Sequence, residues 1–260
     1  MKKQALRLTL GILLTLNMPV ALAKNVGLSL SNYFQTNLKD TELSEHQSSA
    51  TFSLSASYNG FQFGRLNIST SATKNFVDEH EWSLGNSVVS LSKGLGTISN
   101  DKISVSSSSA LIVPTADSTI NNDQLYFGLS QSISFSRQVE SGIGPINLGM
   151  RPKLNFNFHQ YETKVTGASN YQYIFSNSFS LSHSLMDKFN VSLVAQYQRL
   201  FNYNGDSFES YYFGQSISYS VNDYSSITIG HNFGGSLLAA NGSDLNIELF
   251  DKDQSTIYLD

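Results

Sequence analysis

Apolar and polar residues alternate with a period of two over most of this 260-residue chain, most clearly in the stretch Tyr171–Phe201. In its first half, for example, Ser180 stands between Phe179 and Leu181, and a short turn at Met186–Lys188 divides the stretch in two. A period of two predicts β-strands whose two faces meet different surroundings. Each half exceeds the usual strand length of about 5–6 residues and reaches the about 9–11 residues that a tilted strand needs to cross a bilayer. The stretch therefore predicts a hairpin long enough to span a membrane.

The same alternation, read together with the turn residues, predicts twelve strands. Asn59-Gly60 is typical of a tight turn between the second and the third. Gly85 is expected to form a bulge in the fourth, and Pro114 to end the fifth, because proline cannot donate to a strand ladder. The expected strands are Val26–Leu38, Ser48–Tyr58, Gln62–Thr73, Trp82–Ser92, Lys102–Val113, Asp123–Val139, Asn147–Glu162, the two halves of Tyr171–Phe201, Ser210–Val221, Ser226–Phe233 and Thr256–Leu259.

The polar positions of these strands are nearly all Ser, Asn, Gln or Gly, and charge lies mostly in the connections. A soluble sandwich or lipocalin-like barrel, which is the alternative, would display Lys, Glu and Asp on its outside. A polar but charge-poor face favours the water-filled lumen of a transmembrane barrel. Twelve tilted strands would close into a cylinder with a radius of about 12 Å and a lumen on the order of 10 Å.

The connections and the aromatic residues support a membrane orientation. Connections after the odd-numbered strands are mostly long and acidic, whereas those between are mostly short, as in barrels with long outer loops and short periplasmic turns. Aromatic residues gather near strand ends, where interfacial girdles are expected. They include Tyr58, Phe61, Phe76, Trp82, Tyr171, Tyr203, Tyr211, Tyr212 and Tyr224.

The chain begins with features of a secretory signal peptide. Three basic residues within the first seven positions precede the apolar run Leu8–Leu16, and Ala21–Ala23 follows it. This order predicts a cleaved signal at residues 1–23; a membrane anchor is the alternative, but the run is short for a span. The remaining domain, 24–260, holds 13 of the 16 basic residues and all 20 acidic ones, a net charge of −7, and no cysteine. We therefore expect no nucleic-acid partner and no disulfide.

Together, the signal, the alternation, the loop asymmetry and the girdles resemble small, twelve-stranded, porin- or channel-like outer-membrane β-barrel proteins of Gram-negative bacteria. The resemblance is one of pattern, without a family motif. It implies an antiparallel up-and-down barrel with both termini periplasmic, set in outer-membrane lipid and lipopolysaccharide by the barrel-assembly machinery. Such barrels usually end in an aromatic residue, whereas this chain ends Ile257-Tyr258-Leu259-Asp260. Either Tyr258 substitutes or the last strand is short, and ten or fourteen strands remain alternatives.

Within the expected lumen, Arg65, Arg151 and Lys153 are the clearest basic residues, accompanied by the polar Gln196. Rings or ladders of basic side chains select anions in a pore. These residues thus predict a passive channel for small hydrophilic solutes, with a preference for anions as the sharper hypothesis. The alternative is that they are ordinary lumen residues paired with loop acids that fold inward.

The expected outer loops carry acidic residues that could form a charged mouth and concentrate cations. Solvated loop charge without a role is the alternative, because no segment has the spacing of a calcium loop. The candidate mouth residues are Asp40, Glu42, Asp78, Glu79, Asp206, Glu209, Asp251 and Asp253.

Two other functions remain open: a structural or adhesive barrel that binds partners through its loops, and a lipid hydrolase using serine and histidine near the outer rim. His46, His80, His159 and His231 fall near that rim, but the chain contains no Gly-x-Ser-x-Gly elbow. We therefore expect no enzyme, no catalytic residue, no cofactor and no metal site.

Overall fold

The computed structural model describes residues 25–39, 46–77, 81–98, 102–142, 144–186, 188–238, 244–247 and 255–260. The expected signal peptide lies outside these residues. Thirteen strand segments dominate the fold: β1 Val26–Asn37, β2 Ser48–Phe61, β3 Gly64–Asn75, β4 Trp82–Leu84, β5 Ser87–Ile98, β6 Ile103–Val113, β7 Leu125–Ser141, β8 Gly144–His159, β9 Tyr171–Met186, β10 Phe189–Asn202, β11 Ser207–Asn222, β12 Ser225–Ser236 and β13 Ser255–Leu259. A short helix, α3, spans Asp117–Asn121. In the described part of the chain, no helix has the length and apolar character needed to cross a membrane.

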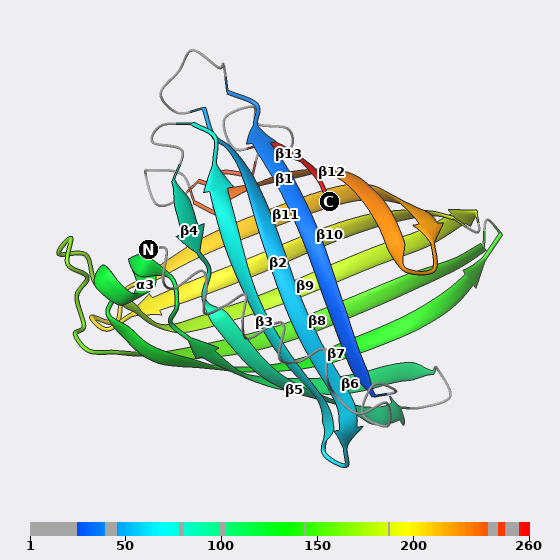
Figure 1. Ribbon diagram of the computed structural model, residues 1–260, viewed down its shortest axis with the longest axis horizontal. Helices are drawn as coiled ribbons and strands as arrows, with labels where there is room; N and C mark the ends of the chain where they lie inside the picture. Colours follow the sequence, from blue (N-terminus) through cyan, green and yellow to red (C-terminus); the bar gives the residue numbers. More distant parts are fainter. Residues whose placement is uncertain are drawn as a thin grey trace.

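The strands form one closed antiparallel barrel in which sequence neighbours pair side by side. β1 closes the barrel because it pairs with β2 on one edge and with β13 on the other. Figure 1 shows the closure, with β1 to β3 in blue and cyan running across the green, yellow and orange strands β7 to β12. The predicted antiparallel up-and-down barrel is therefore confirmed.

β4 and β5 together make one of the twelve wall positions, because both pair with β3. β4 lies beside Ala72–Lys74 and β5 beside Arg65–Ser69, and Gly85 between them donates its backbone N–H to the carbonyl of Ser71. The interruption falls at the glycine where a bulge was expected. Twelve is therefore the strand count of the barrel, as the sequence predicted.

The tight turn predicted at Asn59-Gly60 was wrong, and β5 extends beyond its expected end at Ser92, for the same reason. β2 continues through Asn59-Gly60 to Phe61, and the chain reverses at residues 62–63, where Gly64 follows with a φ of +134°. β5 likewise continues past Gly94, with a register shift between Gly94 and Gly96. A glycine can lie at a bulge within a strand as well as in a turn. In both places the ladder continues past the first glycine.

The connections differ in length at the two ends of the barrel. At one end the links are short: residues 62–63, 99–102, 142–143, 187–188 and 223–224. At the other end they run over residues 38–47, 76–81, 114–124, 160–170, 203–206 and 237–254. We refer to these as the short-turn end and the long-loop end. The asymmetry predicted from the sequence is present, with 203–206 as the shortest link of its set.

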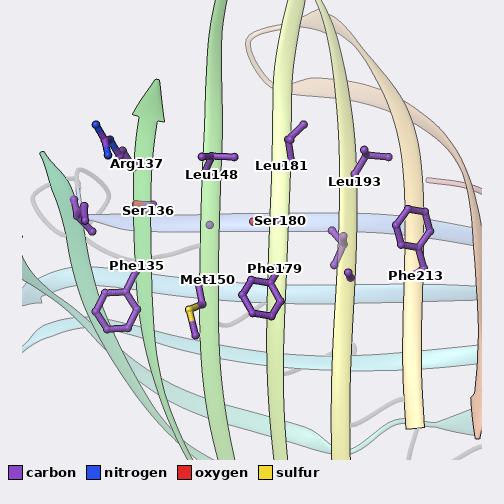
Figure 2. A pocket seen from close by; sticks show the side chains of 14 residues that line it. Phe135, Ser136, Arg137, Leu148, Met150, Phe179, Ser180, Leu181, Leu193 and Phe213 are labelled. Atoms are coloured by element: carbon purple, nitrogen blue, oxygen red, sulfur yellow. The ribbon is translucent and has the colours of Figure 1, made fainter. Parts of the chain in front are cut away.

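Alternate residues place apolar side chains outside and small polar ones inside the barrel. Figure 2 shows the outer face of β7–β11, where two rows of side chains follow the strand pairing: Phe135, Met150, Phe179 and Phe213 in one, and Arg137, Leu148, Leu181 and Leu193 in the other. Between the rows lies a shallow apolar trough of about 490 Å³. Large apolar residues remain exposed here, as in Phe179 at 50%, which is the surface that lipid would cover.

Candidate functional site: the barrel lumen

A continuous row of polar residues crosses the inner wall and contains two of the predicted basic residues. Strand pairing places one residue of each strand from β3 to β10 in this row, excepting the short β4: Arg65, Ser92, Ser108, Ser132, Lys153, Ser176 and Gln198. Because residues paired across strands point to the same face, the register places Arg65 and Lys153 on the same face of the wall as these serines.

The two arginines are held in the same way, each by a buried serine on a neighbouring strand. Arg65 Nη2 donates to Ser57 Oγ at 2.9 Å, and Arg151 Nε donates to Ser132 Oγ at 3.4 Å. Ser57 is 6% exposed and Ser132 3%. Neutral hydroxyl partners fix the guanidinium groups while leaving their charge uncompensated. Within the described ranges, neither arginine nor Lys153 forms an ion pair.

Arg151, Lys153 and Gln196 lie together, whereas Arg65 does not join them. Arg151 pairs with Ser178 of β9, and Ser178 pairs with Gln196 of β10 and donates its hydroxyl to Oε1 of Gln196 at 3.3 Å. Arg65 lies next to Gly64 at the short-turn end, four wall positions from β8, or about 19 Å along the wall. The structure thus places a basic and amide cluster on β8–β10 and a separate arginine on β3.

The acidic mouth is described only at two of its predicted residues. Asp206 accepts from Nδ2 of Asn202 at 3.1 Å within the link between β10 and β11. Glu209 was expected in a loop, but it lies within β11, alternating with the inward Ser210, so it faces outward and contacts Arg199 Nε at 3.5 Å. The other candidates lie outside the described residues: Asp40, Glu42, Asp78, Glu79, Asp251 and Asp253.

A polar vestibule of about 470 Å³ opens at the long-loop end of β1, β2 and β3. Amide and hydroxyl groups dominate its lining, and Glu81 supplies a carboxylate. The principal polar lining residues are Gln35, Asn37, Gln47, Ser49, Thr73, Asn75 and Thr256. These groups can hydrate a solute or hydrogen bond to it at the entrance to the lumen.

At the same end of the barrel, over β7 to β10, hydrogen bonds tie two long connections to each other. The Asn170 amide, 1% exposed, donates to the backbone oxygens of Asp123 and Tyr161 at 3.0 Å each. Lys164 Nζ contacts Asp123 Oδ1 at 2.9 Å. Tyr203 reaches from the next link and donates its hydroxyl to the backbone oxygen of Asn157 at 3.1 Å. This network fixes the rim over β7, β8 and β10.

Replacing Asn170 with alanine is expected to loosen this rim, because two backbone carbonyl groups lose a buried donor. A loss of about 1–3 kcal/mol of local stability would speed trypsin cleavage after Lys164 by about tenfold or more. Gln160→Ala, an exposed amide in the same connection, is the matched control and should leave the cleavage rate unchanged. Equal rates for the two variants would contradict the network.

Three lumen tyrosines form a cluster that the sequence did not single out. The rings of Tyr33 and Tyr258 are 4.9 Å apart, and Asn232 Nδ2 donates to the Tyr33 hydroxyl at 3.2 Å. Tyr212, expected in an outer girdle, pairs with Gln196 and so faces the lumen. A glycine opposite a tyrosine is the sequence feature that could have pointed to this cluster. Gly230 makes room for Tyr258, because a Cβ on Gly230 would lie 2.3 Å from the tyrosine ring.

Of the comparisons with known proteins, the one with solved structures found matches. No protein-family model and no curated protein matches the sequence. The COG4313 outer membrane channel from Pseudomonas putida F1 matches with a TM-score of 0.59 over 93% of this chain and 94% of that chain, at 9% identity. The NanC porin matches with a TM-score of 0.46 over 88% and 98%, at 11% identity. OmpT of Vibrio cholerae matches with a TM-score of 0.39 over 89% and 95%, at 9% identity. The match to the Pseudomonas putida channel shows that this chain shares the fold of that outer membrane channel.

Proposed function

We propose that this protein is a passive channel of a Gram-negative outer membrane that carries small hydrophilic solutes and prefers anions. The observation that supports it best is the inner wall, where serines and amides surround Arg65, Arg151 and Lys153, and no described acidic residue pairs with these cations. In the low dielectric of a narrow lumen, fixed positive charge lowers the free energy of an entering anion and raises that of a cation.

The remaining roles follow from the same arrangement. The long-loop end would face outward and the short-turn end the periplasm, with the vestibule as the entrance. A solute would pass the Arg151, Lys153 and Gln196 cluster on β8–β10 and then Arg65, exchanging hydration water for hydroxyl and amide contacts. The surrounding partners would be outer-membrane lipid and lipopolysaccharide, and the barrel-assembly machinery would insert the chain.

Cysteine modification tests whether solutes pass through this lumen, because the chain contains no cysteine of its own. Ser178→Cys places one thiol on the inner wall beside Gln196, and Phe179→Cys places one on the outer wall a single residue away. A water-soluble, positively charged methanethiosulfonate should lower the conductance of the Ser178→Cys channel by about half, because its bulk and charge enter a lumen of about 10 Å.

The Phe179→Cys channel should not respond to the reagent, because its thiol faces lipid. Equal responses of the two variants would contradict conduction through the lumen. An unchanged conductance of the Ser178→Cys channel after its thiol has been shown to be modified would contradict it as well.

A further inference from the structure

The wall of the barrel is interrupted along one seam. β13 pairs with β1 only from Phe34 to Asn37, and Asp260 adds a backbone pair with Thr228 of β12. Toward the short-turn end, the β1 segment from Val26 to Tyr33 pairs with β2 alone among the described residues. In Figure 1, β1 continues well past β13, while the hairpin of β11 and β12 ends to one side.

Exposure along β1 shows that this edge is open on both faces. Residues 27–32 are exposed without alternation, and Leu28 and Leu30 reach 66% and 68%. Ser29 faces the lumen yet is exposed, whereas the lumen-facing Ser57 on the adjacent strand is only 6% exposed. Where β13 ends, β1 and β12 are two strand spacings apart, about 9.6 Å between backbones.

The slot changes character from the lumen to the outside. The register that joins β1, β13 and β12 places Ser31 opposite Ser226 and Tyr33 opposite Thr228 on the inner rim. On the outer rim it places Leu30 opposite Ser225 and Asn32 opposite Ile227, and Leu30 and Ile227 are 68% and 49% exposed. Free backbone groups in lipid cost several kcal/mol each, so the β1 edge needs water from the lumen or a pairing strand. The hydroxyl groups along the inner rim favour water over a pairing strand as the partner of these backbone groups.

We propose that this slot is a lateral port through which single-chain amphiphiles pass between the lumen and the apolar interior of the membrane. The polar head would contact the hydrated serines of the inner rim, and the hydrocarbon chain would lie against Leu28 and Leu30 of β1 and Ile227 of β12. This route is separate from axial conduction of hydrophilic solutes, and its failure would leave the channel proposal standing. An extended polypeptide strand that fills the slot is the competing occupant.

Photolabelling in native outer-membrane vesicles tests the port, with dodecanoic acid that carries a diazirine next to its carboxyl group as the probe. Mass spectrometry should find label at the lumen-facing residues 29 and 31 of β1 and 226 and 228 of β12. Lumen-facing Ser180 and Ser192, on the unbroken wall of β9 and β10, serve as internal controls and should stay unlabelled. Label confined to the outward residues of β1 and β12 would overturn the port.

A bridge across the slot gives a second test. The register that joins Phe34, Leu259 and Ile229 places Ser31 and Ser226 opposite each other, so cysteines there should be joined by a bis-maleimide of matching length. The bridge should reduce labelling at residue 29 by tenfold or more. The control pair Ser182→Cys and Ser192→Cys, directly paired on β9 and β10, should leave labelling as it was. Failure to bridge, together with slow amide exchange along β1, would show a strand in the slot and contradict the proposal.

Discussion

Replacing Gly64 with alanine will destabilise the folded barrel by about 3 kcal/mol, because the change adds backbone strain and a collision with another strand. Gly64 has a φ of +134°, and a Cβ built on it would lie 2.2 Å from the backbone oxygen of Ser92. Neither partner can yield cheaply, since Arg65 and Ser92 are paired in the ladder between β3 and β5. Urea unfolding followed by circular dichroism would measure the loss.

Gly94→Ala is the matched control for this effect. Gly94 lies in β5, its φ is not in the left-handed region, and a Cβ there would meet nothing within 4 Å. Its replacement should change the free energy of unfolding by less than about 0.5 kcal/mol. Equal stability of the two variants would show that the tight reversal between β2 and β3 is not fixed by the glycine.

Reversing both charges of the β8 pair will invert the ion selectivity. Arg151→Glu with Lys153→Glu replaces two cations, which form no ion pair with a described residue, by two anions at neighbouring inward positions of one strand. Because these charges act within a Debye length of about 10 Å at 0.1 M salt, the anion-to-cation permeability ratio should fall by on the order of tenfold. The measurement is the reversal potential across a KCl gradient.

Lys93→Glu makes the same kind of change on the outward face of β5 and should leave the reversal potential where it was. Neutral Arg151→Gln with Lys153→Gln should give an intermediate value. An unchanged potential in the double-glutamate channel would mean that the β8 pair does not face the path of the ions.

Much of the fold was predictable because one physical requirement repeats along every strand. A wall between lipid and water demands alternate apolar and polar side chains, so the strands and the inward face of Arg65, Arg151, Lys153 and Gln196 follow from periodicity. The interruption between β4 and β5 falls at Gly85, where the sequence predicts a bulge because a glycine breaks the alternation of the strand.

The arrangement around the lumen was less predictable, because it depends on register and not on periodicity. The pairing of Gln196 with Ser178 brings the amide to Arg151, and no local pattern encodes that match. Glu209 was misplaced because β11 begins at Ser207, three residues earlier than the alternation suggested. Tyr212 was misplaced because an aromatic near a strand end fits either face; the register with Gln196 decides for the lumen.

The most direct test of a water-filled channel is the single-channel current of the purified, folded protein in a planar bilayer under a KCl gradient. The structure predicts discrete conductance steps and a reversal potential displaced toward the equilibrium potential of chloride. A folded barrel that inserts and carries no current would contradict the account and direct attention to the loops as binding surfaces.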